Sequence, residues 1–139
     1  KKICNQFAAI ADQADYIAGI EARGFIFASA VAALTNKGFI PIRKSGKLPG
    51  KVLSKMYDLE YGKSSLEIHT EIVPAGGKVL LIDDVLATGG TAIAAIELLK
   101  LAELNPVCIA FLLEIPALGG RSRIAKAHPD IEIATILAE

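Results

Sequence analysis

Two adjacent acids followed by a glycine-rich turn form the part of the chain with the clearest potential for chemistry. Asp83 and Asp84 end an apolar run, and the turn Ala87-Thr88-Gly89-Gly90-Thr91 follows them. Backbone N–H groups and threonine hydroxyls in such a turn can bind a phosphate, assisted by the dipole of a helix that starts there. Carboxylates beside the phosphate could bind ribose hydroxyls or a hydrated Mg²⁺. Two acids alone would also fit an exposed strand end, but the whole stretch indicates a site for a phosphorylated sugar.

The segments on either side place this turn at the ligand-binding edge of a sheet. Residues 79–82 are apolar at every position, which predicts a parallel strand covered on both faces. Residues 92–104 repeat apolar side chains at helical spacing, which predicts an amphipathic helix. Open α/β sheets bind ligands at the carboxyl ends of their strands. No Gly-Lys-Ser/Thr follows the glycines and no dinucleotide fingerprint is present, so a P-loop and a dinucleotide site are excluded.

Strand and helix patterns alternate along most of the 139 residues. We expect further strands at 16–20, 39–43, 107–115 and 131–137, and helices at 3–14, 25–36 and 120–128. This alternation predicts one α/β domain over residues 1–139, with a central, mostly parallel sheet flanked by helices. Residues 44–66 interrupt the rhythm, and we expect a flexible loop over the active site there, with an extended strand at 51–59.

The composition narrows the classes of partner. Hydrophobic residues make up 53% and aromatic residues 6%, which fits an α/β domain, and 15 basic residues balance 15 acidic ones. We therefore expect neither nucleic acid nor a membrane surface as a partner. Cys4 and Cys108 follow no metal or redox spacing, which favours a reducing, cytoplasmic location. The longest nearly apolar stretch, residues 24–34, is too short to span a bilayer.

Two basic segments fit a second anionic group. Arg23, beside Gly24 in a predicted strand-to-helix turn, could present its planar guanidinium to a diphosphate, or could simply cap the sheet edge. Arg43, Lys44, Lys47 and Lys51 form a basic cluster. The cluster could be an ordinary solvated charge run, or it could stabilise a pyrophosphate leaving group.

The motifs together resemble those of adenine phosphoribosyltransferases, within the type I phosphoribosyltransferases. The resemblance covers about residues 16–121. It rests on motifs that occur in the same order and with the same spacing as in the family. These are Glu21-Ala22-Arg23-Gly24-Phe25, Ile42-Arg43-Lys44, Gly46-Lys47-Leu48-Pro49, Leu59-Glu60-Tyr61-Gly62 and the stretch Asp83 to Thr91. The last motif alone indicates only the superfamily, whereas the lysine-rich loop with Leu-Glu-Tyr-Gly indicates the adenine branch.

The resemblance implies a type I phosphoribosyltransferase fold and a reaction in purine salvage. Adenine and phosphoribosyl pyrophosphate (PRPP) would give AMP and pyrophosphate with Mg²⁺, in a homodimer. The metal would be held mainly by PRPP and water, near Asp83 and Asp84, with no direct protein ligand. The implied phosphate-binding residues are Ala87, Thr88, Gly89, Gly90 and Thr91, and the implied ribose-binding residues are Asp83 and Asp84. The implied pyrophosphate-binding residues are Ala22, Arg23, Arg43, Lys44 and Lys47.

Three further residues take roles from the same resemblance. Glu60 is the candidate general acid/base at the purine, since a carboxyl group near N7 can manage the base's protonation. Tyr61 would help to close the loop, and Ile115 would form an apolar wall against the base or belong to the core. The family also implies a cis peptide bond between Ala22 and Arg23.

Alternatives to this assignment remain. Family members carry an additional N-terminal hood segment that recognises adenine, and we expect it to be missing from this chain. The same fold also serves in PRPP-binding domains of purine-responsive transcription regulators, which catalyse nothing. A phosphoribosyltransferase for another purine base is the third candidate.

Overall fold

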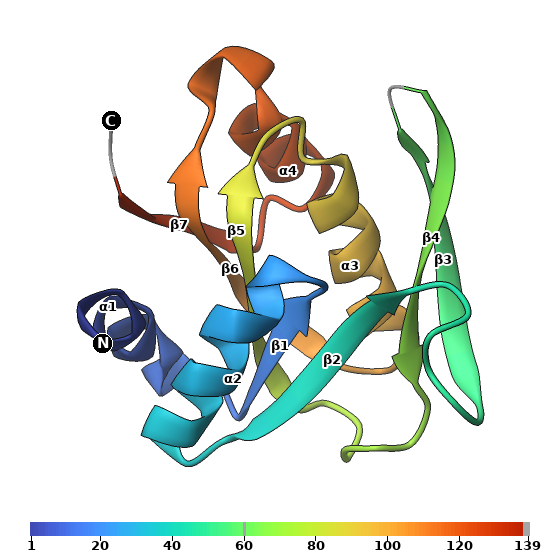
Figure 1. The fold of residues 1–139 in the computed structure, drawn as a ribbon, viewed down its shortest axis with the longest axis horizontal. Coiled ribbons are helices and arrows are strands. Elements are labelled where there is room, and N and C mark those ends of the chain that lie inside the picture. Colours follow the sequence, from blue (N-terminus) through green and yellow to red (C-terminus); the bar gives the residue numbers. More distant parts are fainter. Residues whose placement is uncertain (60, 138–139) are drawn as a thin grey trace.

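The computed structural model describes residues 1–59 and 61–137, which form one seven-stranded sheet with helices on both faces (Figure 1). The strands are β1 (Tyr16–Ile20), β2 (Gly38–Lys44), β3 (Val52–Leu59), β4 (Gly62–His69), β5 (Lys78–Leu86), β6 (Asn105–Glu114) and β7 (Glu132–Leu137). The helices are α1 (Lys2–Ile10), α2 (Arg23–Thr35), α3 (Gly90–Leu101) and α4 (Gly120–Ala127), with 3-10 turns η1 (Ala11–Gln13) and η2 (Pro116–Leu118). Within these described ranges, no helix is long and apolar enough to cross a membrane.

The sheet order is β3-β4-β2-β1-β5-β6-β7. Strands β2, β1, β5, β6 and β7 are parallel, whereas β4 is antiparallel to both β2 and β3. The prediction of a central, mostly parallel sheet flanked by helices is therefore confirmed. The predicted excursion at residues 44–66 contains the β3–β4 hairpin, and its flexibility stays a prediction.

Alternation along β5 divides the core into two layers. Leu80 and Ile82 pack with α1 and α2 on one face, and Val79 and Leu81 pack with α3 on the other. All four side chains are fully buried, as expected for a central parallel strand. The β3–β4 hairpin lies on the α3 side, where the ion pair between Lys55 Nζ and Glu97 Oε2 (2.8 Å) joins it to the helix.

The connections define where a ligand can bind. The chain leaves β1 through α2 to β2 on one side, and leaves β5 through α3 to β6 on the other. The strand order reverses between β1 and β5, so the loops that follow these two strands diverge and leave a crevice at their carboxyl ends. The predicted turns at residues 21–25 and 83–91 both lie at this point.

Candidate active site

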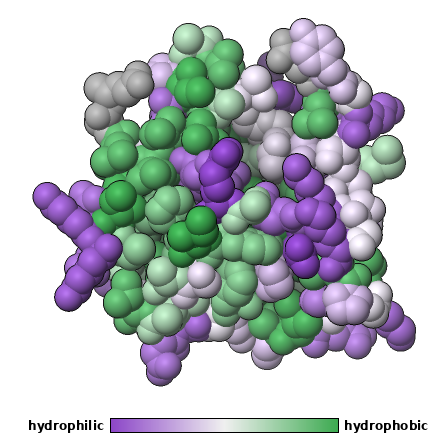
Figure 2. Space-filling view, viewed as in Figure 1, coloured by the Kyte–Doolittle hydropathy of each residue, from purple (hydrophilic) through white to green (hydrophobic). Residues whose placement is uncertain are grey.

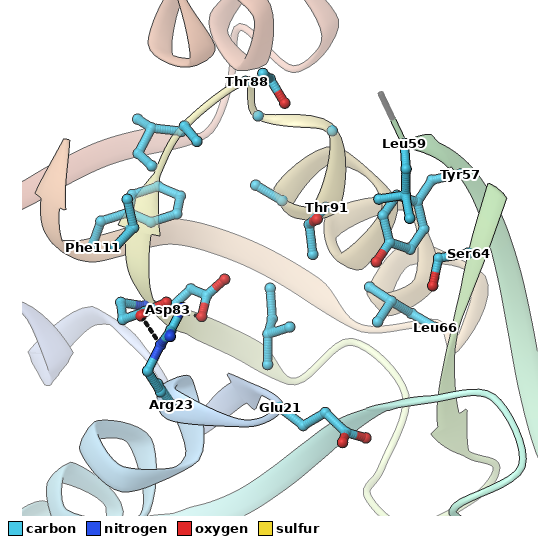
Figure 3. A pocket seen from close by; sticks show the side chains of 18 of the residues that line it. Glu21, Arg23, Tyr57, Leu59, Ser64, Leu66, Asp83, Thr88, Thr91 and Phe111 are labelled. Atoms are coloured by element: carbon cyan, nitrogen blue, oxygen red, sulfur yellow. Dashed lines mark hydrogen bonds and ion pairs between the residues drawn. The ribbon is translucent and has the colours of Figure 1, made fainter. Parts of the chain in front are cut away.

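A cavity of about 610 Å³ opens at the crevice between β1 and β5 (Figure 3). Its wall includes the phosphate-loop residues, both acids and part of the predicted pyrophosphate group. The predicted residues that line it are Ala22, Arg23, Lys44, Asp83, Asp84, Ala87, Thr88, Gly89, Gly90 and Thr91. Segments that are more than 60 positions apart in the sequence thus converge on one space.

The phosphate loop joins β5 to α3. The helix begins at Gly90, earlier than predicted, and Gly89 before it has φ +81°, a left-handed conformation that favours glycine. The backbone of α4 packs against this loop, because a Cβ on Gly120 would lie 2.2 Å from the carbonyl oxygen of Ala87. The loop is therefore positioned by two helices. One face of it remains open to the cavity.

Asp83 and Asp84 occupy different environments although they are neighbours in β5. Asp84 is ion-paired with the Nε of Arg23, whose side chain is 75% exposed. The Asp84 backbone N–H donates to Asp83 Oδ1 at 2.9 Å. Burial raises the pKa of Asp83 to about 7, and the Asp84 charge adds to this effect, while the Asp84 N–H opposes it. With this pKa, Asp83 is close to half-protonated at neutral pH.

The predicted basic residues divide into two groups. Arg23 and Lys44 line the cavity. Arg43 and Lys47 instead bind Glu21, with Arg43 Nε 3.3 Å from Oε1 and Lys47 Nζ 2.5 Å from Oε2. Burial raises the pKa of Glu21, but hydrogen bonds from Lys47 and the Lys44 N–H, with the charges of Lys47 and Arg43, outweigh this and hold it below its usual value.

The cis peptide bond at this turn joins Glu21 to Ala22, so its predicted position between Ala22 and Arg23 was wrong by one residue. The Glu21 N–H still donates to the Ile42 carbonyl at 2.9 Å, which continues the sheet pairing up to Glu21. The chain turns away from the sheet directly afterwards, before Ala22.

Three predicted residues lie away from the cavity lining or cannot be placed. Ile115 follows β6 and is partly exposed, and its N–H donates to the Leu86 carbonyl at 2.9 Å. Tyr61 is 92% exposed at the end of the β3–β4 hairpin. Glu60 lies outside the described residues. The roles of these three residues stay predictions.

Several cavity residues were not predicted from the sequence. Tyr57 and Ser64 come from the β3–β4 hairpin, and Phe111 comes from β6. Arg123 on α4 donates from Nη1 to the Thr88 carbonyl at 3.4 Å, which brings a cation beside the phosphate loop. Phe111 pairs with Asp83 across β5 and β6, so the two side chains lie on the same face of the sheet. The alternation of side chains along the predicted strand was the sequence signal that could have indicated Phe111.

Within the described part of the chain, no three His, Cys, Asp or Glu side chains come together to hold a metal ion. Asp84 is already paired with Arg23, so the two acids are not a free carboxylate pair. Their oxygens fit a hydrated Mg²⁺ carried by a phosphorylated ligand better than a resident ion.

Comparison with known proteins agrees with the fold. The phosphoribosyl transferase domain model matches residues 1–137, and the chain belongs to this family. The adenine phosphoribosyltransferase of Trichodesmium erythraeum is 55% identical over 112 residues, which is 81% of this chain and 66% of that protein. The Thermobifida fusca enzyme of the same name is 46% identical over 127 residues, 91% of this chain and 70% of that protein. The chain thus spans about two thirds of the length of these relatives.

Solved structures give the same result. The Saccharomyces cerevisiae adenine phosphoribosyltransferase, solved with D-2,5-dideoxy-2,5-imino-altritol 1,6-bisphosphate and adenine, has a TM-score of 0.90 and 37% identity, and the match covers 98% of this chain and 78% of that chain. The Giardia lamblia enzyme, solved with 9-deazaadenine, has a TM-score of 0.89 and 36% identity, covering 99% and 77%. The predicted resemblance to adenine phosphoribosyltransferases is confirmed.

Proposed function

We propose that this protein transfers the 5-phosphoribosyl group of PRPP to adenine, giving AMP and pyrophosphate, in purine salvage. The observation that carries the proposal is the convergence of the phosphate loop, Asp83, Asp84 and Arg23 on one cavity at the strand-order reversal. A sugar with phosphate groups at both ends fits this arrangement, because anion donors lie on two sides and carboxylates lie between them. The names of the relatives supply the base.

The chemistry follows from where the charges lie. The loop from Ala87 to Thr91 would bind the 5′-phosphate through N–H groups and hydroxyls. The carboxylate of Asp84 would stabilise positive charge on the ribose ring as the bond to pyrophosphate breaks, as in other oxocarbenium-like transition states. Arg23 and Lys44 would bind the departing pyrophosphate. Adenine must lose its N9 proton as it attacks C1, and Glu60 is the proposed general acid/base for this step.

When bound together with the diphosphate of PRPP, Mg²⁺ would neutralise part of the charge on the leaving group. Residues of the chain would orient the sugar and exclude water. Asp83 would orient ribose hydroxyls, and the β3–β4 hairpin, whose Tyr57 and Ser64 line the cavity, would exclude water over the reacting bond.

We also propose a cytoplasmic homodimer. Ile26 and Leu34 on α2 are 66% and 54% exposed, and Figure 2 shows apolar side chains gathered over much of the face that carries α1 and α2. A second copy of the chain would cover such a surface. Light scattering of the purified protein tests the dimer, and a monomeric mass at micromolar concentration would contradict it.

Pyrophosphate release with PRPP and Mg²⁺ tests the function, with adenine, hypoxanthine, guanine and xanthine offered separately. We expect turnover with adenine alone. Turnover with another base instead would make the protein a different purine phosphoribosyltransferase. A folded protein that binds PRPP and turns over no base would instead support a PRPP-binding sensor.

A further inference from the structure

Glu21 binds basic residues that the proposed function assigns to pyrophosphate. Its Oε1 accepts hydrogen bonds from the Lys44 backbone N–H at 2.7 Å and from Arg43 Nε at 3.3 Å. Its Oε2 binds Lys47 Nζ at 2.5 Å. The Glu21 side chain is only 6% exposed, although the residue contributes to the cavity wall (Figure 3). One buried carboxylate therefore engages two cations and the end of β2.

This pairing changes the charge that the cavity offers to an anion. Arg23 is paired with Asp84, and Arg43 and Lys47 are paired with Glu21. Three of the four basic residues assigned to pyrophosphate thus already have a carboxylate partner. An entering diphosphate must share these cations with the carboxylates or displace them.

The backbone of the turn after β2 is held without the Glu21 charge. Ser45 Oγ and the Gly46 N–H donate to the buried Glu67 at 2.9 and 3.2 Å. Arg43 Nη1 also donates to the Lys47 carbonyl at 3.2 Å. These contacts already fix the shape of the turn. The turn therefore does not need a negative charge at Glu21 to keep that shape. That charge does account for where the Lys47 ammonium group lies.

We propose that Glu21 is an internal substitute for pyrophosphate. Its single negative charge offsets one of the two positive charges of Arg43 and Lys47, and Lys47 leaves Glu21 for the diphosphate when this binds. The inference rests on the proposed function and makes Glu21 a positioning residue that acts through Lys47. Its consequence is a lowered affinity for pyrophosphate, which favours release of this product.

Calorimetric titration of Mg²⁺-pyrophosphate into the whole chain tests the proposal without any base or turnover. Glu21→Gln keeps the side chain's size and an acceptor for the Lys44 N–H, but removes the charge. We expect pyrophosphate to bind about tenfold more tightly to this variant, because Lys47 no longer has to leave a charged partner, and a hydrogen bond to a charged group is worth roughly a factor of ten or more in affinity. Glu132→Gln, an exposed change on β7 with the same effect on net charge, should bind as the wild type does.

A double-mutant cycle identifies Lys47 as the residue through which Glu21 acts. Lys47→Ala alone should weaken binding only slightly, and the gain from Glu21→Gln should disappear in the double variant. If Glu21→Gln binds pyrophosphate equally or more weakly, Glu21 only organises the turn and the proposal is wrong. If the wild type itself does not bind pyrophosphate, this proposal and the proposed pyrophosphate site both fail.

A measurement on the wild type keeps the test independent of how the variants fold. In a crystal structure with pyrophosphate, Lys47 Nζ should bind a diphosphate oxygen and lie beyond hydrogen-bond distance of Glu21. A Lys47 still bound to Glu21, with pyrophosphate in the cavity, would overturn the proposal.

Discussion

The guanidinium of Arg23, at the start of α2, is ion-paired with the carboxylate of Asp84, 61 positions later in β5. The pair crosses the point where the strand order reverses, and it joins the residue assigned to pyrophosphate with the residue assigned to ribose. Because the Arg23 side chain is 75% exposed, the pair contributes little to folding, roughly 0–1 kcal/mol. The main effect of the pair is therefore to position the Arg23 guanidinium and the Asp84 carboxylate in the cavity.

Asp84→Asn should impair turnover far more than folding. Removing the carboxylate deprives the ribose ring of a negative charge as positive charge develops, so we expect kcat/KM for PRPP to fall about a hundredfold. The melting temperature should stay within a few degrees of the wild-type value. Steady-state kinetics and a thermal melt of the same preparation check this. A large loss of thermal stability with proportionate activity would instead assign Asp84 a structural role.

Asp83 should make stability fall as the pH rises from about 4 to about 7. Its pKa in the folded protein, about 7, lies above the ordinary value of 3.8, so the folded state binds this proton more tightly than the unfolded state. The proton favours folding below pH 4, and this contribution is lost as the pH passes through 7. Since one pKa unit corresponds to about 1.4 kcal/mol, the loss is about 4 kcal/mol at most.

Asp83→Asn isolates this effect from the other titrating groups. Urea unfolding of both proteins at pH 4 and pH 7.5, with EDTA present, gives the difference in free energy of unfolding. The variant should gain stability relative to the wild type between these two pH values. A pH-independent difference would mean that Asp83 titrates near its ordinary pKa.

Hydrophobic pattern predicted the sheet and its helices because the core residues repeat with the period of each element. The ends of the elements depend on contacts that the pattern does not contain. Strand β5 was expected to end at Ile82, since aspartate is rare in strands. It continues to Leu86 because its pairing with β6 extends through Asp83 and Val85. The two acids therefore lie within a strand and not in the following turn.

The candidate site was predictable where one motif carries the chemistry, as in the phosphate loop. The partners of Arg43 and Lys47 were not predictable, because nothing local to them indicates Glu21, which precedes them by more than 20 positions. The position of Arg123 beside Thr88 likewise depends on how α4 packs against the loop. Such contacts follow from the tertiary arrangement and leave no periodic signal in the sequence.

Glu60→Ala tests the proposed general acid/base. Because proton transfer at the base contributes to the rate and not to PRPP binding, kcat should fall about a hundredfold while the Kd for PRPP stays nearly constant. Glu132→Ala, a change of the same type on β7, serves as the control. Rapid-quench kinetics with adenine separate the chemical step from product release. An unchanged rate of that step would remove Glu60 from the chemistry.

Gly120→Ala should disturb the phosphate loop from outside the cavity. The added Cβ would lie 2.2 Å from the Ala87 carbonyl oxygen and 3.0 Å from the Gly89 nitrogen, and neither backbone atom can move without shifting the loop. We expect a loss of about 1–3 kcal/mol in the free energy of unfolding, as for other overpacked sites. The affinity for PRPP should fall as well, because the N–H groups that bind the phosphate are displaced.

Gly90→Ala is the matched control for stability, since a Cβ there would have no neighbour closer than 3.6 Å. Its free energy of unfolding should stay at or slightly above the wild-type value, because alanine favours a helix more than glycine does. Urea unfolding compares the two variants, and titration with PRPP measures the loop in Gly120→Ala. If Gly120→Ala matched the wild type in both measurements, α4 would not position the loop, and the convergence of α4 with β5 and α3 would carry no functional meaning.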